Sequence, residues 1–200
     1  MLESTLITNY TIHAMKKVIS IIAIPLFAVA CTPSEPKNSL KNSGFEQEHP
    51  KNQAKGWYAG QHAGEDAYIM QLDSNIFFEG KSSFGIEQYK EQVYAVVEQS
   101  VRIPKGKHKK FIFSAMLKTE NVEPGEGWKL VVNCREEDGY IAKQYQSSIA
   151  LTATTDWQKV TIEADIPENT IKIDVGAMLQ SKGKAWIDNA NLIIDPVKNK

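Results

Sequence analysis

The sequence predicts an all-β protein whose single domain is an antiparallel β-sandwich. Short segments rich in β-branched and aromatic residues follow one another at short, regular spacing. Turn-forming residues, mainly glycine, proline and aspartate, separate these segments. No long stretch has the apolar periodicity of a helix. Together these three observations favour a sandwich of antiparallel strands over any helical or mixed fold.

Most of the expected strands combine aromatic and branched residues, and several of them alternate between apolar and polar side chains. In one such segment Val97, Gln99, Val101 and Ile103 share one face, as expected where one side of a sheet is buried. We expect strands at residues 68–72, 84–89, 95–103, 111–118, 128–134, 140–148, 159–164, 171–179 and 185–194.

Turn signals lie between the expected strands, and most of the connections they predict are short. Short connections suit antiparallel neighbours, because parallel strands need a long crossover. The basic run at residues 105–110 falls in one of these connections, and we expect it to be a solvated hairpin. The predicted turns are at residues 79–81, 104–107, 124–127, 138–139, 155–156 and 182–184.

The first 30 residues have the layout of a secretion signal. Lys16 and Lys17 precede an apolar run at 18–30 that is shorter than the ~20 residues of a membrane-spanning helix. Residues 1–14 precede the lysines, so we expect translation to start at Met15. The small residues before Cys31 resemble a bacterial lipoprotein signal, which implies an acylated Cys31 at the mature N-terminus. Residues 28–30 also fit ordinary cleavage, which would leave Cys31 free.

The rest of the chain divides into a tether, a domain and a tail. Residues 31–41 comprise the lipidated cysteine and a polar, proline-containing tether, which cannot pack a core. Residues 42–195 form the sandwich, and residues 196–200 form the tail. This organisation predicts an exported protein that is lipid-anchored to a bacterial membrane, on its periplasmic side or at the cell surface.

Charge and cysteine content narrow the function. The chain has 23 basic and 24 acidic residues and a pI of about 6.4, which gives no electrostatic case for nucleic-acid binding. Cys134 has no possible disulfide partner except an unacylated Cys31, so the domain must be stabilised by its core. We expect Cys134 to be a small buried hydrophobic residue.

Several short motifs occur in an order that resembles a known family. Because of them the chain, over residues 40–194, resembles carbohydrate-binding modules of families four and nine, which are galactose-binding-like jelly rolls. The resemblance implies a jelly-roll sandwich that binds an oligo- or polysaccharide. The same fold also serves as a structural or protein-interaction module of envelope complexes, which is the alternative function. The motifs are Asn42-Ser43-Gly44-Phe45-Glu46, Gly56-Trp57, Gly80-Lys81-Ser82-Ser83, Gln99-Ser100-Val101, Phe113-Ser114-Ala115, Asp156-Trp157 and Trp186-Ile187-Asp188.

A sugar site needs aromatic faces with polar side chains beside them, because pyranose rings have apolar faces and hydroxyl edges. Trp128, Tyr140 and Tyr68 are the candidate stacking residues, and Gln144 and Arg135 are the candidate polar partners. Trp57, Tyr58, Tyr145, Asn133 and Gln146 are also available. The alternative is that these aromatic residues fill the core or plug loops.

The resemblance also implies one structural calcium ion, held where the first and last strands meet. Carried onto this chain, its ligands are Glu46, the carbonyl of Lys81 and Asp188, with Asp73 as a further candidate. Calcium takes six to eight oxygens, which carboxylates and carbonyls can supply. The alternative is that Glu46 and Asp188 accept hydrogen bonds from nearby turns.

One segment raises the question of catalysis. Glu163, Asp165 and Glu168 have a spacing that resembles the catalytic strand of jelly-roll β-glucanases, in which paired carboxylates act on a glycosidic bond. Ala164 replaces the usual branched residue, and Pro167 removes a donor from the supposed strand. We therefore expect no enzyme, with a jelly-roll glycoside hydrolase as a remote alternative.

Overall fold

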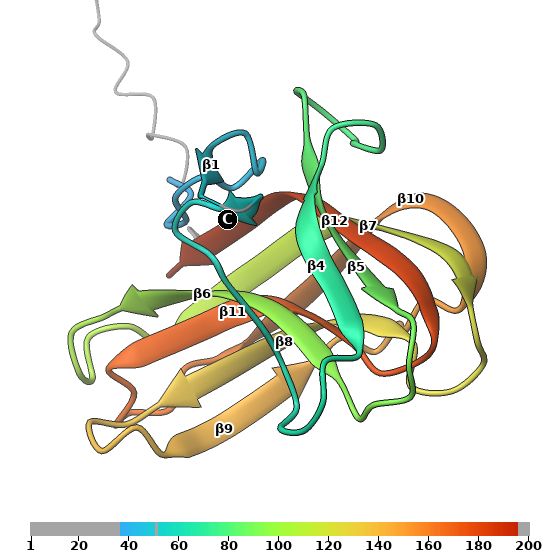
Figure 1. The fold of residues 1–200 in the computed structure, drawn as a ribbon. Helices are drawn as coiled ribbons and strands as arrows, with labels where there is room; N and C mark the ends of the chain where they lie inside the picture. Colours follow the sequence, from blue (N-terminus) through green and yellow to red (C-terminus); the bar gives the residue numbers. More distant parts are fainter. Residues whose placement is uncertain (1–36, 51, 196–200) are drawn as a thin grey trace, which may run out of the picture. The chain divides into compact units, whose positions relative to one another are not determined.

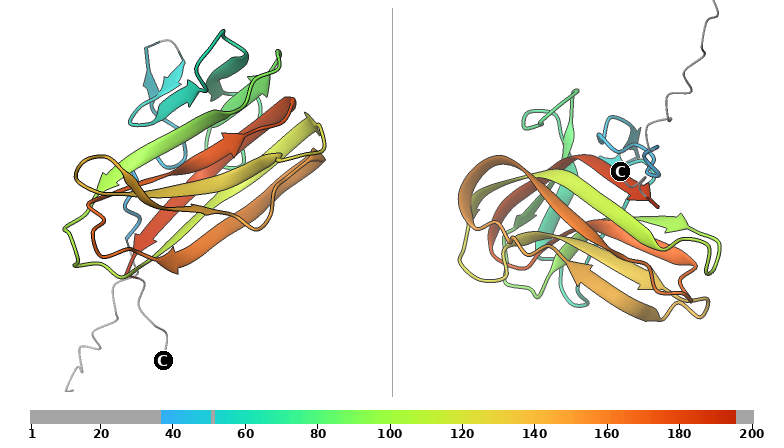
Figure 2. Two further views of the ribbon diagram at one scale, coloured as in Figure 1. Left: turned by 90° about the horizontal axis from the view of Figure 1, so that it is seen from below. Right: turned by 180° about the vertical axis from the view of Figure 1, so that it is seen from behind.

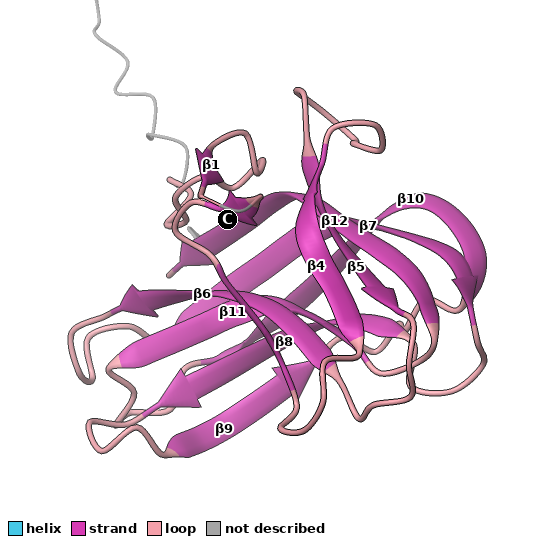
Figure 3. Ribbon diagram, in the orientation of Figure 1, coloured by secondary structure: helices cyan, strands magenta, loops and turns pink. Residues whose placement is uncertain are grey.

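The computed structural model describes residues 37–50 and 52–195. The predicted signal, Cys31 and the tail at 196–200 lie outside these residues. The described part consists of strands and connecting loops, and none of it is a helix that could cross a membrane (Figure 3). Its strands are β1 (Glu48–His49), β2 (Gln53–Ala54), β3 (Tyr58–Gln61), β4 (Tyr68–Asp73), β5 (Ser83–Gln88), β6 (Ala95–Arg102), β7 (Lys110–Val122), β8 (Trp128–Arg135), β9 (Ile141–Gln146), β10 (Ala153–Asp165), β11 (Lys172–Leu179) and β12 (Gly183–Ile194).

Ten of these strands form two five-stranded sheets, which lie over each other (Figures 1 and 2). Sheet I has the order β3-β6-β11-β8-β9, and sheet II has the order β10-β7-β12-β5-β4. Strands β1 and β2 form a separate small hairpin. Every neighbouring pair is antiparallel. The predicted antiparallel sandwich is therefore confirmed.

The core lies between the two sheets and follows from strand alternation. On β7, Phe111, Phe113, Ala115 and Leu117 point inward and are buried, and each strand contributes side chains of one parity. Sheet I adds Trp128, Leu130, Val132 and Cys134 from β8, together with Ile173, Val175, Ala177 and Leu179 from β11. Burial raises the pKa of the Cys134 thiol to about 11, in line with its expected role as a buried hydrophobic residue.

The last strand shows how a local irregularity keeps the core filled. The backbone of Asn189 has a positive φ of 47°, and the register of β12 against β7 shifts between Asp188 and Asn191. Ile187, Ala190 and Leu192 are all fully buried, although a regular strand would not place all three on one face. The bulge therefore returns the apolar residues after it to the inner side.

Some sequence predictions were wrong in detail. The turn expected at residues 155–156 lies inside β10, where the register against β7 shifts before and after Thr155. Thr155 Oγ1 is 2.9 Å from Thr119 Oγ1, so this irregular stretch still pairs with β7. The sequence does not reveal strands β1, β2 and β3, because they have only two, two and four residues.

Candidate functional site

The outer face of sheet I is hollowed into a groove of about 510 Å³. All five strands of the sheet contribute to it, so it crosses the sheet from one edge strand to the other. Its lining combines aromatic, amide, charged and aliphatic side chains. The lining residues used below are Tyr58, Gly60, Tyr94, Glu98, Val131, Asn133, Arg135, Ile141, Gln144 and Gln146.

The strand register arranges the groove residues in rows that run across the sheet. The central row begins with Tyr58 on edge strand β3, continues through Glu98, Gly176 and Val131, and ends with Gln146 on β9. A neighbouring row contains Ser100, Asp174, Asn133 and Gln144. The central row therefore has an aromatic residue at one edge of the sheet and an amide at the other.

Two glycines shape this surface, Gly60 on the edge strand β3 and Gly176 on the central strand β11. A Cβ atom at Gly60 would lie 2.3 Å from the Tyr58 hydroxyl, so the tyrosine ring extends over this glycine. A Cβ atom at Gly176 would lie 1.9 Å from the Val97 carbonyl oxygen, so β6 and β11 approach closely only because position 176 is glycine. Tyr58 is 62% exposed, and its ring is available for contact with a ligand.

A hydrogen-bonded network fixes the polar half of the groove. Asp174 is almost fully buried and accepts a hydrogen bond from Ser100 Oγ at 2.6 Å and one from Arg135 Nε. Arg135 also donates to the Gly139 carbonyl at 3.0 Å, which ties it to the β8–β9 hairpin. Gln144 donates to Asn133 Oδ1 at 2.8 Å. These contacts hold Arg135 and the amides in set positions before any ligand arrives.

Glu98 lines the groove, and its surroundings change the pKa of its carboxyl group. Burial raises its pKa above the ordinary value, and the negative charge of Asp174 raises it further. The positive charges of Arg135 and Lys172 act in the opposite direction without cancelling the effect. The groove therefore contains a half-buried carboxyl group between an exposed tyrosine and the polar network.

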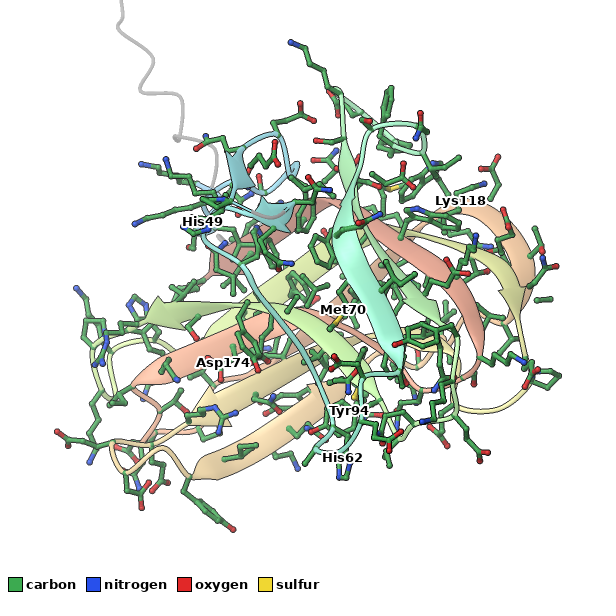
Figure 4. All side chains as sticks on the ribbon, in the orientation of Figure 1. His49, His62, Met70, Tyr94, Lys118 and Asp174 are labelled. Atoms are coloured by element: carbon green, nitrogen blue, oxygen red, sulfur yellow. The ribbon has the colours of Figure 1, made fainter. Side chains whose placement is uncertain are left out.

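A second tyrosine lies further along the groove. The ring of Tyr94 contacts the His62 ring edge-on, with centroids 5.5 Å apart. Figure 4 labels Tyr94, His62 and Asp174. Tyr94 precedes Ala95, which pairs with Leu179 at the end of β11, whereas Asp174 lies near the start of that strand. Tyr58 and Tyr94 both come from the β3–β6 side of sheet I, which makes this side the aromatic half of the groove.

The structure brings together only part of the predicted sugar site. Gln144 and Arg135 line the groove as expected of polar partners. The prediction of Trp128 as a stacking residue is wrong, because Trp128 is fully buried and its indole donates to the Trp186 carbonyl at 3.1 Å. Tyr68 is also a core residue, only 6% exposed, and burial raises its pKa to about 12. Tyr140 is 69% exposed in the β8–β9 hairpin, next to the groove residue Ile141.

The predicted calcium ligands are only partly brought together. Glu46 and Asp188 line one hollow with Glu79, whereas Asp73 accepts a hydrogen bond from the Trp186 indole at 2.9 Å in a different one. No group of three or more His, Cys, Asp or Glu residues in the described ranges is placed to bind a metal ion.

Both carboxylates at this position accept hydrogen bonds from backbone amides. Glu46 accepts from Lys81 N at 2.9 Å, and Asp188 accepts from Phe78 N at 2.9 Å and Glu79 N at 3.1 Å. Burial raises the pKa of Asp188 despite these bonds. In the described geometry the carboxylates hold the β4–β5 loop against the first and last segments of the domain, as the alternative to calcium expects.

The carboxylates of the glucanase-like segment lie on the opposite sheet. Glu163 and Asp165 are exposed on β10, which is an edge strand of sheet II. Asp165 is 3.6 Å from Lys110 Nζ, and its carbonyl accepts a hydrogen bond from the Tyr145 hydroxyl. The exposed side chains of Glu163 and Asp165 therefore lie on the outer face of sheet II, whereas the groove is on the outer face of sheet I.

The sequence has one reported similarity to a known protein and no match to a protein family. No family model matches the sequence. The chain is 25% identical over 148 residues to the uncharacterized HTH-type transcriptional regulator YbfP of Bacillus subtilis (strain 168), a match that covers 72% of this chain. The chain spans about half the length of that curated relative, 49% of it.

Several solved structures have a similar fold at low sequence identity. The enzymatically active domain of Bacteriophage CBA120 tailspike protein 4 matches with a TM-score of 0.60 and 13% identity, over 78% of this chain and 21% of that chain. The CBM22-1 xylan-binding domain of Paenibacillus barcinonensis Xyn10C matches with a TM-score of 0.57 and 16% identity, over 83% and 99% of the two chains.

A third structure, TmCBM61 in complex with β-1,4-galactotriose, matches with a TM-score of 0.51 and 17% identity, over 78% of this chain and 98% of that chain. These likenesses concern the fold, since all are below 25% identity. The domain formed by the described residues is a jelly-roll β-sandwich, the fold of the carbohydrate-binding modules it resembles.

Proposed function

We propose that this protein is a non-catalytic carbohydrate-binding protein whose groove on sheet I binds a segment of an oligo- or polysaccharide. The observation that carries the proposal is the composition of the groove. An exposed tyrosine ring lies at one edge, and ordered amide and charged side chains lie across the rest of the surface. The similarity to carbohydrate-binding modules supports the same function.

The chemistry of the groove suits a pyranose chain. The Tyr58 ring can cover the apolar face of one sugar ring. Asn133, Gln144 and Gln146 present amide donors and acceptors, and Arg135 presents further donors, which suits a ligand rich in hydroxyl groups. Because the network among these side chains is already formed, little ordering is needed when the ligand binds.

The test is affinity electrophoresis of the domain in gels that contain soluble polysaccharides, followed by calorimetry with xylohexaose, cellohexaose and β-1,4-galactotriose. We expect retardation by at least one glycan and at least a 10-fold loss of affinity in Tyr58→Ala, because the aromatic platform is removed. Phe77→Ala is the matched control, since Phe77 is an exposed aromatic residue in the β4–β5 loop outside the groove. Unchanged mobility on plant, algal and host polysaccharides alike would favour the alternative, a structural or protein-interaction module.

We also propose that the protein is exported and anchored to a bacterial membrane through lipid on Cys31. The support is the sequence pattern of residues 15–31 and the polar tether that follows it. One acyl chain anchors a protein only marginally, so stable attachment requires more than one chain. Labelling with radioactive palmitate should mark the wild type and not Cys31→Ala. An unlabelled wild type found free in the periplasm or medium would indicate ordinary signal cleavage.

A further inference from the structure

Glu98 differs from the other charged groups of the groove because its carboxylate is not engaged. Asp174, the neighbouring acid, has both oxygens occupied by Ser100 and Arg135. Glu98 lines the groove and is half-buried, yet within residues 37–50 and 52–195 its carboxylate forms neither a hydrogen bond nor an ion pair. A carboxylate removed from part of its water without a partner is unfavourable, so a ligand that donates hydrogen bonds to it would offset that cost.

The strand register leaves this carboxylate accessible from the groove. Tyr58 is directly opposite Glu98 on β3, and Gly176 is directly opposite on β11. Since Gly176 has no side chain, nothing on β11 at that position covers the carboxylate. The next residue in the row is Val131, which is buried and apolar. Glu98 therefore has the Tyr58 ring on one side, and on the other side a glycine followed by an apolar residue, Gly176 and Val131.

The charged side chains that act on Glu98 come from the neighbouring strands β11 and β8. From β11 it faces Asp174 and Lys172, and from β8 it faces Arg135. Both cations are within ion-pair distance of Asp174, and the Lys172 Nζ to Asp174 Oδ1 distance is 3.6 Å. Asp174 thus competes for the positive charge that would otherwise neutralise Glu98. The carboxylate keeps its acceptor capacity for a ligand.

We propose that Glu98 is a specificity-determining residue that accepts hydrogen bonds from two adjacent hydroxyls of the sugar ring on Tyr58. An ionised carboxylate has two oxygens and only accepts, so it matches a pair of hydroxyl donors. The groove should therefore select neutral glycans with a free vicinal diol at this position. Uronate or sulfate groups would be repelled there by the negative charge. This inference rests on the proposed carbohydrate binding.

The test is calorimetry at pH 7 with whichever of xylohexaose, cellohexaose and β-1,4-galactotriose binds the wild-type domain. Glu98→Gln keeps the size of the side chain but replaces one acceptor oxygen by a donor. We expect this variant to bind about 10-fold to 100-fold more weakly, the range for a lost hydrogen bond to a charged group. Glu163→Gln is the control, because it removes the same charge from the exposed face of β10. Both variants should retain the wild-type melting temperature within a few degrees.

A pH series separates a direct role from a structural one. Protonated Glu98 resembles glutamine, so the difference in affinity between the wild type and Glu98→Gln should shrink as the pH falls through the pKa of Glu98. Because burial raises that pKa, the difference should begin to shrink above pH 4.5. Comparing the two proteins at each pH removes contributions from acids that do not interact with Glu98.

The possible outcomes distinguish this inference from the proposed function. Weak binding by Tyr58→Ala together with unchanged binding by Glu98→Gln would overturn the role of Glu98 and leave the groove as the site. A Glu98→Gln deficit that is constant with pH would overturn it as well. If the wild type is retarded by none of the polysaccharides and binds none of the oligosaccharides, the proposed function fails and the inference fails with it.

Discussion

Trp128 shows why a single residue can be assigned to the wrong side of a sheet. It begins β8, and the alternation of that strand directs it, with Leu130, Val132 and Cys134, into the core. Its outward-facing neighbours Lys129, Val131, Asn133 and Arg135 form the groove side. The first set is entirely apolar and the second contains one apolar residue, Val131, so the alternation itself places Trp128 in the core, whereas its residue type alone does not.

Replacing Trp128 should therefore affect folding and not ligand contact. Trp128→Ala would leave a cavity in the core and a Trp186 carbonyl without its donor. We expect a loss of about 3–5 kcal/mol in the free energy of unfolding, measured by urea denaturation. A variant of wild-type stability with weakened glycan binding would place Trp128 in the site instead.

Asp73 provides a prediction about pH. Burial alone would raise its pKa, but hydrogen bonds from Asn75 N, the Trp186 indole and Ile76 N outweigh burial and lower it. A carboxyl whose pKa is lower in the folded state stabilises the fold above its unfolded pKa, and this contribution is lost as the pH falls through the folded pKa.

We accordingly expect Asp73→Asn to be less stable than the wild type at pH 7, with a difference that decreases below about pH 4. Thermal unfolding of both proteins from pH 2 to pH 8 measures this difference. A gap between the two melting temperatures that is independent of pH would mean that ionised Asp73 does not stabilise the fold.

At the scale of elements, the groove depends on the close approach of β6 and β11. The two strands pair along their whole length, and the absence of a Cβ atom at Gly176 permits this spacing. The carbonyl of Val97 would overlap with any larger residue there. The glycine therefore shapes both the ladder and the floor of the groove.

Gly176→Ala should destabilise the domain by at least about 1–3 kcal/mol, because the added methyl must displace backbone. It should also weaken glycan binding, since the backbone that the methyl displaces is that of Val97 and Glu98. Urea unfolding and calorimetry measure the two effects. Normal stability in this variant would show that the strands have room to separate.

The sequence was sufficient to predict most strands and their antiparallel arrangement, because alternation and turn residues are local signals. Segments 111–118 and 171–179 were predicted correctly to within a few residues of β7 and β11. The groove was not predictable in the same way. Tyr58 and Glu98 are 40 positions apart and become neighbours only through the pairing of β3 with β6. The short strand β3 has too little apolar character to reveal that pairing.

At the scale of the whole molecule, calcium binding stays a prediction. The fold resemblance implies it, whereas the hydrogen bonds to Glu46 and Asp188 can hold the same loops without metal. If calcium binds, addition of a chelator should lower the melting temperature by several degrees, and excess calcium should restore it, since a ligand of the native state stabilises it. Identical melting curves with and without chelator would assign the stabilisation to the hydrogen bonds alone.

The central claim is that the outer face of sheet I binds the glycan. Its most direct test is an NMR titration of the isotope-labelled domain with an oligosaccharide that binds. The account predicts chemical-shift changes concentrated in the groove residues of β3, β6, β8 and β9, including Tyr58, Glu98 and Gln144. Changes concentrated on β4, β5 and β10 of sheet II, with the groove unaffected, would contradict it.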